Sequence, residues 1–336
     1  MPNPLETLTL RDLENWDRRD EAGNFLPSLA VLGHPVSHSV SPQMHNAALA
    51  HLVTQGHEKL KDWCYFKFDI EPDAHELEKV FRLLKQKNFQ GLNLTVPLKG
   101  LAAMILLLKS NISATALSAV NTVVFTEEIK ALNTDGFGMV EALKHDLKVS
   151  LDGRTVVILG AGGAATEVAD ECIRRKCATL WVGSRDLKKR EEMEVRLIQY
   201  VHEEFKALPP IAPKVCSFNF TEPPIGEWPE DVIIINATTL GMKSDDPVPF
   251  DVKPLGDKAC VMDMVYNRSG PTKLVAAAQA RGLRATDGLS MLVWQGAKSL
   301  SIWLQSQAAL AIQPEVLAPT MMTAACQALG LPPRHA

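Results

Sequence analysis

Short apolar runs alternate with amphipathic segments along the first part of this chain. Apolar or alternating runs at 29–32, 64–70 and 91–96 predict three strands. Pro42 is predicted to begin a helix with Ser41 as its N-cap, and residues 43–55 continue it. Residues 71–88 carry apolar side chains at helical spacing. Strands in alternation with helices predict an α/β region with a mainly parallel sheet. It continues with a predicted helix at 101–108 and a predicted hairpin at 119–125 and 130–133.

The rest of the chain repeats this alternation around a glycine-rich turn. The apolar run 155–159, the turn, a helix that ends near Lys176 and the apolar run 179–182 form a βαβ unit of about 30 residues. That is the length of one mononucleotide-binding half of a dinucleotide-binding domain. Further strands are predicted at 214–218, 231–237, 259–264 and 284–285, and further helices at 135–147, 191–205, 289–312 and 317–329.

Composition and charge narrow the class of protein. The 336 residues are enough for about two domains, and a formal net charge of −4 disfavours nucleic acid as the main partner. No apolar run reaches the ~20 residues of a membrane span, and the polar N-terminus shows no secretory signal, so we expect a cytoplasmic protein. The six cysteines form no CxxC pair. His34, His38 and His45 have no acidic partner nearby in the sequence, so we expect no metal site.

The glycine-rich turn carries the most specific motif of the sequence. It follows a predicted strand, opens a predicted helix and reads Gly160, Ala161, Gly162, Gly163, Ala164 and Ala165, which fits G-x-G-x-x-A. Gly160 permits a tight turn, Gly162 lets a pyrophosphate approach the backbone, and Ala165 keeps the helix close to the strand. Free N–H groups at the start of the helix would then bind the phosphates of a dinucleotide.

The end of the next predicted strand indicates which dinucleotide binds. NAD-binding proteins usually place an acidic residue there for the ribose 2′-hydroxyl. This chain has Ser184 followed by Arg185, and Lys189 lies one helical turn further on. These residues suit a 2′-phosphate, and we therefore expect NADP as the cofactor. Asp186 leaves a second interpretation open, because it could cap the helix or accept the 2′-hydroxyl of NAD.

Polar side chains follow the strands of the first half, in the segments 37–42, 93–99, 121–122 and 133–136. Parallel sheets bind ligands beyond the carboxyl ends of their strands, and these hydroxyls and amides suit a polyhydroxylated acid. Lys99 and Asp135 are the cation and the anion of these segments. The lysine could exchange a proton with a reacting hydroxyl, and the aspartate could orient the lysine and bind that hydroxyl.

With these segments, the sequence resembles the shikimate dehydrogenase family from about residue 29 to residue 304. The resemblance rests on nine segments in the family's order, which are HSVSP at 38–42, NLTVPLK at 93–99, AVNT at 119–122, NTDG at 133–136, GAGGA at 160–164, SRDLKK at 184–189, NATTLGM at 236–242, DMVYN at 263–267 and DGLSMLVWQGA at 287–297. Such an ordered set is specific, although no single segment is.

The resemblance implies roles for individual residues. Lys99 would be the acid/base lysine, with Asp135 at the reacting hydroxyl. The residues implied around the substrate are Ser39, Ser41 and Tyr266 at its carboxylate, Asn93 and Thr95 beside its ring, and Asn121, Asp135 and Gln295 at its hydroxyls. The residues implied around the nicotinamide and its ribose are Thr238, Leu240, Met264 and Gly288.

The implied protein has an α/β substrate domain with a mainly parallel sheet and a Rossmann-like NADP-binding domain, with a cleft between them. We expect the substrate domain to comprise 1–132 and 289–336, because the chain must return from the NADP-binding domain, 133–288, for Gln295 to reach the site. The implied reaction is the reversible, NADP-dependent reduction of 3-dehydroshikimate to shikimate, catalysed by a monomer or a homodimer.

Two alternatives stay open. One is a quinate/shikimate dehydrogenase that prefers NAD. Relatives that favour quinate often have threonine at the position of Ser41, so Ser41 and Arg185 together favour shikimate and NADP. The other is a binding homologue without catalysis, which would normally lose the proton-transfer pair. Lys99 and Asp135 are both present, so the sequence favours an enzyme.

Overall fold

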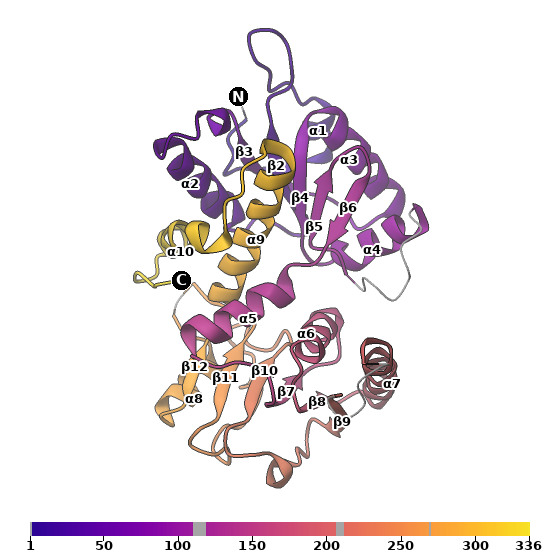
Figure 1. Cartoon of the computed structure of the whole chain (residues 1–336), viewed down its shortest axis with the longest axis vertical. Helices are drawn as coiled ribbons and strands as arrows, with labels where there is room; N and C mark the ends of the chain where they lie inside the picture. The colour runs from indigo at the N-terminus through magenta and orange to yellow at the C-terminus, as the bar shows by residue number, and fades with distance from the viewer. Residues whose placement is uncertain (1, 110–118, 206–211, 269) are drawn as a thin grey trace. The chain divides into compact units, whose positions relative to one another are not determined.

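The fold comes from a computed structural model, which describes residues 2–109, 119–205, 212–268 and 270–336. The chain divides into two compact units. The first comprises Met1–Thr134 and Val293–His335, and the second comprises Asp135–Leu292. Helix α5 begins at the first boundary, and helix α9 runs across the second (Figure 1).

The first unit contains a mixed six-stranded sheet in the order β1-β3-β2-β4-β5-β6. The first four strands in this order are parallel, and β5 and β6 complete the sheet as an antiparallel hairpin. The strands are β1 (Thr7–Thr9), β2 (Ser28–Gly33), β3 (Cys64–Asp69), β4 (Phe89–Leu94), β5 (Thr122–Phe125) and β6 (Ile129–Leu132). This agrees with the predicted α/β class with a mainly parallel sheet.

The two faces of this sheet have different neighbours, because side chains alternate along each strand. On β3, Phe66 and Phe68 point into the main apolar core, while Tyr65 and Lys67 belong to the other face. On that other face the ring of Tyr65 stacks on His45 of α2. The helices of the unit are α1 (Leu10–Glu14), α2 (Ser41–Thr54), α3 (Ala74–Gln86), α4 (Leu98–Lys109), α9 (Gly288–Ala308) and α10 (Pro314–Leu329), with a short 3-10 turn η1 (Glu58–Leu60).

The N-terminal segment adds elements that the sequence did not predict. Strand β1 pairs with β3 and extends the edge of the sheet, and α1 follows directly. Trp16 anchors this segment in the core, with its ring 4.8 Å from that of Phe66 and 5.2 Å from that of Phe89. A strand of three residues has too little periodicity to be recognised locally, and its pairing depends on a distant edge.

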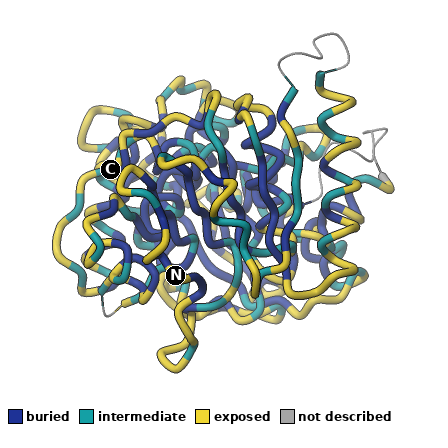
Figure 2. Tube along the Cα trace, turned by 90° about the horizontal axis from the view of Figure 1, so that it is seen from below, coloured by how far each residue is buried: buried dark blue, intermediate teal, exposed yellow. Residues whose placement is uncertain are grey.

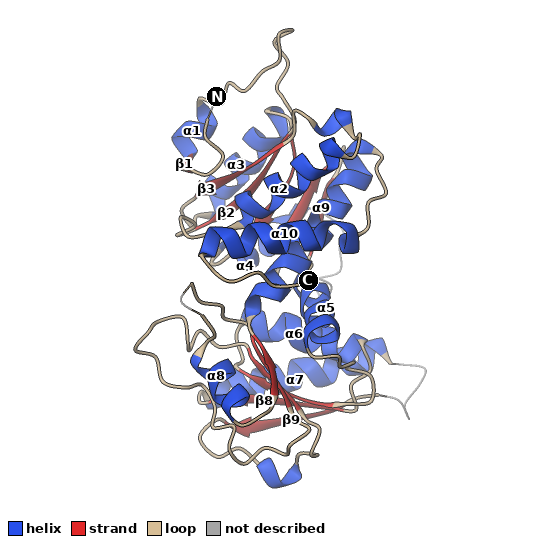
Figure 3. Ribbon diagram, turned by 90° about the vertical axis from the view of Figure 1, so that its left-hand side faces the viewer, coloured by secondary structure: helices blue, strands red, loops and turns tan. Residues whose placement is uncertain are grey.

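The C-terminal part departs from the prediction at the end of α9 and at the start of α10, which begins at Pro314 and not at residue 317. Helix α9 was expected to continue to residue 312, but it ends at Ala308, and Ala309 has a positive φ of 51°. The chain then turns, and the side chain of Ser301 holds it through a hydrogen bond to the carbonyl of Ile312 (2.6 Å). Helix α10 follows and packs beside α2 (Figure 3).

The second unit contains a fully parallel six-stranded sheet in the order β12-β11-β10-β7-β8-β9. This is the predicted Rossmann-like arrangement. The strands are β7 (Thr155–Leu159), β8 (Thr179–Ser184), β9 (Lys214–Asn219), β10 (Ile233–Asn236), β11 (Cys260–Asp263) and β12 (Arg284–Thr286). The helices are α5 (Asp135–Asp146), α6 (Gly163–Arg174), α7 (Leu187–Glu204) and α8 (Lys273–Ala280), with a 3-10 turn η3 (Ile225–Glu227).

Apolar clusters cover both faces of the second sheet. Val156 and Ile158 of β7 face one cluster, whereas Val157 and Leu159 face the other. Burial on both faces explains why these strands read as continuous apolar runs in the sequence. Figure 2 shows buried stretches of the chain in the interior and exposed stretches at the outside. Within the residues that the structure describes, no helix is both long and apolar enough to cross a membrane.

Candidate functional site

The serine loop (residues 34–40) connects β2 to α2 in the first unit. Its Ser39 is half-buried, and Ser41, the first residue of α2, is buried. The hydroxyl oxygen of Ser39 accepts a hydrogen bond from the backbone N–H of Ser41 (3.3 Å). The two predicted carboxylate-binding serines therefore lie side by side at the start of a helix, where free N–H groups also favour an anion.

Two residues of strand β3, Lys67 and Asp69, bind the serine loop. The carboxylate of Asp69 contacts His34 Nδ1 (2.6 Å) and accepts a hydrogen bond from the backbone N–H of Val36 (3.3 Å). Lys67 Nζ donates a hydrogen bond to the carbonyl of Ser37 (2.8 Å). The loop thus has a fixed path between two elements of regular structure.

A buried network of amides and hydroxyls lies beside this loop at the ends of β4 and β5. Asn93 Nδ2 donates to the carbonyl of Asn121 (3.0 Å) and to Ser299 Oγ (3.0 Å). Asn121 Nδ2 donates to Thr134 Oγ1 (3.0 Å) and Gln295 Oε1 (3.3 Å). Three predicted substrate residues, Asn93, Asn121 and Gln295, therefore share one hydrogen-bonded cluster within the first unit, and all three are at most 8% exposed.

The network contains residues that the sequence did not single out. Tyr65 donates its hydroxyl hydrogen to Asn93 Oδ1 (2.8 Å), and Thr122 Oγ1 lies 2.8 Å from Ser299 Oγ. Thr134 is a central member, because it contacts both Asn121 and Gln295. Thr134 lies in the NTDG segment that the sequence did mark, whereas Tyr65 and Ser299 gave no local signal, since each belongs to a regular strand or helix.

Thr95 and Lys99 follow β4, near the start of α4. Both residues are half-buried. The backbone of Thr95 is paired through its N–H with the carbonyl of Leu32 (2.9 Å), and the carbonyl of Lys99 accepts a hydrogen bond from Val120 (3.1 Å). Lys99 is thereby fixed beside the segment that leads into Asn121.

Burial of His45 makes folding stability depend on pH. Its ring stacks on Tyr65 with the ring centroids 4.0 Å apart, and its Nδ1 lies 2.9 Å from the carbonyl of Ser41. Burial lowers the pKa of His45 to about 4, although the Ser41 carbonyl acts in the opposite direction. An unfolded histidine has a pKa near 6.5. The free energy of unfolding is therefore unaffected by His45 above about pH 6.5, where the ring is neutral in both states. It decreases as the pH falls from about 6.5 towards 4, because the unfolded chain binds a proton that the folded protein does not.

We expect the titration of His45 to lower the free energy of unfolding by about 2 kcal/mol when the pH changes from about 8 to about 5. Urea unfolding of the wild type and of His45→Phe at both pH values measures it. The variant should lack this part of the pH dependence. An identical pH dependence in both proteins would show that His45 titrates as it does in the unfolded chain.

The glycine-rich turn of the second unit joins β7 to α6. Gly160 has a φ of +123°, and a Cβ atom at this position would lie 3.1 Å from the carbonyl oxygen of Ala237. Both features explain why the turn needs glycine there. Gly162 is the N-cap of α6, and Gly162, Gly163 and Ala164 are exposed. The first N–H groups of a 12-residue helix are therefore accessible to an anion.

A pocket of about 480 Å³ opens at this turn. The predicted cofactor residues that line it are Gly160, Ala161, Gly162, Ser184, Arg185, Lys189, Thr238 and Leu240. Four others lie outside its walls. Gly163 and Ala164 form the first turn of α6, while Met264 and Gly288 touch each other at the ends of β11 and β12. Phe220 and Thr239 also line the pocket, although the sequence did not single them out.

The basic residues of this pocket suit a phosphate. Among the residues that the structure describes, the side chains of Arg185 and Lys189 make no hydrogen bond or ion pair. Asp186 is the N-cap of α7, and its carboxylate accepts a hydrogen bond from the backbone N–H of Lys189 (3.1 Å). Of the two roles left open for Asp186, the structure therefore shows the helix cap.

Asn236, a buried polar residue, holds the segment 237–240 that lines part of the pocket. Asn236 Oδ1 accepts hydrogen bonds from the N–H and the hydroxyl of Thr238 (3.1 and 2.7 Å). Asn236 Nδ2 in turn donates to Asp263 (2.8 Å), which also accepts from Thr272 (2.6 Å). Burial raises the pKa of Asp263, while the bonds from Thr272, Val265 and Asn236 act to lower it. The NATTLGM segment is thus held in place by its own asparagine.

Asp135 and Tyr266 are the remaining predicted substrate residues, and both belong to the second unit. Asp135 is the first residue of α5 and is 9% exposed. Tyr266 follows β11 and is half-buried, and burial raises the pKa of its hydroxyl. Asp135 thus begins a helix, and Tyr266 lies in the loop that follows a strand.

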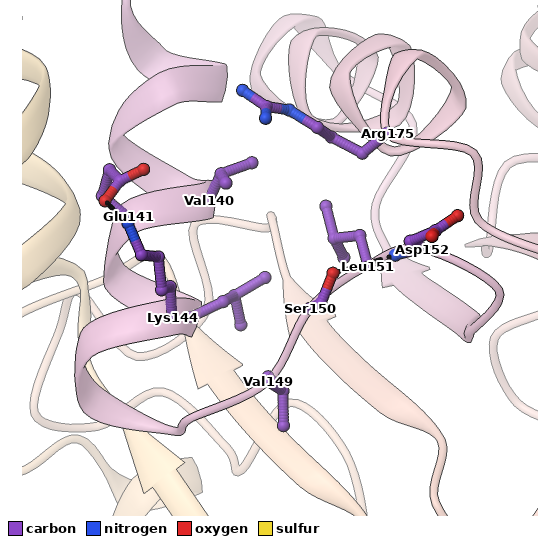
Figure 4. A pocket seen from close by; sticks show the side chains of 9 residues that line it. Val140, Glu141, Lys144, Val149, Ser150, Leu151, Asp152 and Arg175 are labelled. Carbon is purple, nitrogen blue, oxygen red and sulfur yellow. Dashed lines mark hydrogen bonds and ion pairs between the residues drawn. The ribbon is translucent and has the colours of Figure 1, made fainter.

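A smaller hollow of about 330 Å³ lies at the other end of β7 from the glycine turn. Figure 4 shows its apolar floor, which includes Val140 and Leu151, and the side chains of Glu141, Lys144 and Arg175 around it. Lys144 pairs with Glu141 (3.0 Å), and Arg175 pairs with Glu171 (2.8 Å). Its charges are therefore largely satisfied within the protein. Among the described residues, no cluster of histidine, cysteine and acidic side chains could hold a metal ion.

Known proteins resemble this chain over both units. Residues 31–123 match the family described as the shikimate dehydrogenase substrate binding domain. A protein of Moorella thermoacetica named shikimate dehydrogenase (NADP(+)) is 35% identical over 298 residues, which cover 87% of this chain and 93% of the relative. A protein of the same name from Methanosarcina acetivorans is 36% identical over 277 residues, which cover 81% and 91%.

Solved structures give the same result. The structure of shikimate 5-dehydrogenase from Thermus thermophilus in complex with NADP(H) and shikimate is 30% identical in sequence. It superimposes with a TM-score of 0.64 and covers 89% of this chain and 100% of its own. A relative above 30% identity that is matched over nine-tenths of its length shares the ancestry of the whole protein, and so this chain belongs to the shikimate dehydrogenase family.

Proposed function

We propose that this protein is an NADP-dependent shikimate dehydrogenase, which reduces 3-dehydroshikimate to shikimate and catalyses the reverse reaction. The observation that carries the proposal is the buried network of Asn93, Asn121 and Gln295, which gathers amide and hydroxyl groups in the unit that also contains the half-buried Lys99. A polyhydroxylated ring needs such a set of donors and acceptors. The curated relatives carry the corresponding name.

The substrate residues follow from charge and hydrogen bonding. Ser39 and Ser41, with Tyr266, bind the carboxylate, and the start of α2 adds backbone N–H groups at the serines. Asn93, Thr95, Asn121, Asp135 and Gln295 bind the ring and its hydroxyls. Lys99 gives a proton to the oxygen of the ketone as that oxygen becomes a hydroxyl, and in the reverse direction Lys99 takes the proton back. Asp135 orients the lysine and the reacting hydroxyl.

The second unit has the features that NADP requires. The exposed first turn of α6 would hold the pyrophosphate, and the side chains of Arg185 and Lys189 would bind the 2′-phosphate. Thr238, Leu240, Met264 and Gly288 would line the nicotinamide and its ribose. When bound, NADPH supplies the hydride that the ketone carbon receives. The unit Met1–Thr134 with Val293–His335 would be the substrate domain, and Asp135–Leu292 the NADP-binding domain.

A spectrophotometric assay of the purified protein tests the proposal. NADPH and NADH oxidation would be followed with 3-dehydroshikimate, and reduction of both oxidised cofactors would be followed with shikimate and with quinate. The highest kcat/KM is expected for shikimate with NADP. A higher value for quinate with NAD would replace this function by the quinate alternative, and no turnover with any pair would favour a binding homologue. Cell fractionation and sedimentation would test the cytoplasmic location and the monomeric or homodimeric state that we also propose.

Loss of either serine hydroxyl is expected to act on substrate binding. Ser39→Ala and Ser41→Ala each remove one hydrogen bond to a charged carboxylate, which typically contributes ~1.5–3 kcal/mol. The KM for shikimate should therefore rise by about 10-fold or more, with little change in kcat. Steady-state kinetics with shikimate at saturating NADP measure both parameters. A lower kcat with unchanged KM would contradict the role in carboxylate binding.

A further inference from the structure

Lys67 is a charged residue in an unusual place. It lies in the middle of β3, between two parallel neighbours, and pairs in register with Thr7 of β1 and Val31 of β2. Only 5% of its surface is exposed. Lysine is rarely buried to this degree, because removing an ammonium group from water costs free energy. A buried lysine in a central strand therefore needs a reason.

One hydrogen bond of Lys67 connects it to the serine loop. Its Nζ donates a hydrogen bond to the carbonyl of Ser37 (2.8 Å), so its positive charge lies against the backbone of the serine loop. Ser37 is two residues before Ser39 and four before Ser41. Asp69, which lies on the same face of β3, is held by His34 Nδ1 (2.6 Å) and by the N–H of Val36 (3.3 Å). The acid thus binds the start of the loop, and the lysine lies closer to the two serines along it.

The proposed substrate needs such a charge. Hydroxyl groups can donate hydrogen bonds to a carboxylate, but they are neutral and do not compensate its charge. An anion that leaves water for a partly buried site is costly unless a positive charge lies nearby. The serine loop itself contains no lysine or arginine.

We infer that Lys67 is a specificity-determining residue, whose buried positive charge makes the serine loop selective for substrates with a carboxylate. This inference rests on the proposed function, because it assumes that Ser39 and Ser41 bind the carboxylate of shikimate. Lys67 acts through the loop and through its charge, and it takes no part in hydride or proton transfer.

Calorimetric binding of shikimate and of its uncharged methyl ester separates this role from a structural one. The variants are Lys67→Met, which removes the charge and the donor, Lys67→Gln, which keeps an N–H donor without charge, and Lys67→Arg, which keeps the charge. Lys85→Met is the matched control, because Lys85 also donates to a backbone carbonyl of the first unit, that of Glu127 (2.8 Å), but is exposed on α3. Circular dichroism reports whether each variant is folded.

Lys67→Met and Lys67→Gln should weaken shikimate binding by about 10-fold or more, the typical effect of losing one charge-assisted interaction, and should change ester binding far less. Lys67→Arg and Lys85→Met should bind shikimate much as the wild type does. In turnover assays the KM for shikimate should rise in the uncharged variants, while kcat changes little.

Three results would overturn the inference. If the variants bind shikimate and its methyl ester with equally reduced affinity, Lys67 only holds the loop in place. The same conclusion follows if Lys67→Gln binds shikimate as tightly as the wild type does. Unchanged shikimate binding in both uncharged variants would remove Lys67 from recognition. If the wild type binds no shikimate, the proposed function itself fails, and this outcome is distinct because it appears before any variant is compared.

Discussion

Replacement of Lys99 by alanine is expected to lower kcat by ~10²–10⁴, with a smaller effect on the affinity for shikimate. The reaction transfers a proton to or from the oxygen of the reacting hydroxyl or ketone. Lys99, which lies in one of the polar segments of the first unit, is the proposed group for that transfer. The half-buried position of Lys99 at the start of α4 keeps it beside the segment that carries Asn121. Steady-state rates in both directions, together with a direct measurement of shikimate binding, test this expectation.

A matched substitution makes the result specific. Lys130→Ala removes an exposed lysine from β6 of the same unit and should leave turnover unchanged. If Lys99→Ala keeps near-normal kcat while it folds and binds shikimate normally, Lys99 is not the acid/base group. Loss of binding without loss of kcat would instead give Lys99 a role in holding the substrate.

Replacement of Arg185 by alanine is expected to raise the KM for NADP by ~10–150-fold and to leave the KM for NAD almost unchanged. A lost charge-assisted hydrogen bond costs ~1.5–3 kcal/mol, which corresponds to that range. Arg185 and Lys189 line the pocket at the glycine turn, and neither side chain is engaged by another described residue. Asp186 also lines this pocket, and its carboxylate caps α7 through the backbone N–H of Lys189. Kinetics with both cofactors measure the two constants.

Lys188 provides the control for the cofactor prediction. It is exposed on the same helix, lies 3.8 Å from Glu192 and does not line the pocket, so Lys188→Ala should change neither constant appreciably. Equal losses for NADP and NAD in Arg185→Ala would make Arg185 a structural residue. A wild-type preference for NAD would contradict the NADP assignment and favour the quinate alternative.

Much of this fold could be predicted because its elements carry local signals. The strands β7 and β10 each contain a continuous run of buried apolar residues, 156–159 and 233–235, which is easy to recognise in the sequence. The turn at Gly160 requires a positive φ and a close approach to Ala237, which only glycine meets without strain, so the motif is visible in the sequence. The serine loop and the NTDG segment were recognised because they place polar residues directly after strands.

Other features depend on segments that are distant in sequence. Strand β1 has three residues, and only the free edge of β3 makes it a strand. Ser299 enters the polar network because α9 returns to the first unit and places it 3.0 Å from Asn93, 206 residues earlier in the chain. Helix α9 ends at Ala308, where Ala309 has a positive φ, and the hydroxyl of Ser301 binds the carbonyl of Ile312 in the segment that follows. No periodicity in the sequence predicts this end.

The sequence by itself therefore determined the family resemblance, the α/β class and the positions of the glycine turn and the serines, since each depends on a local pattern or an ordered set of motifs. Tertiary structure decided the roles that depend on a partner. Asp186 became a helix cap through Lys189, and Tyr65 joined the amide network through Asn93. Lys67 came to lie beneath the serine loop through Ser37, 30 residues away. A hydrogen bond across the fold has no periodicity along the chain, so only the packed structure reveals it.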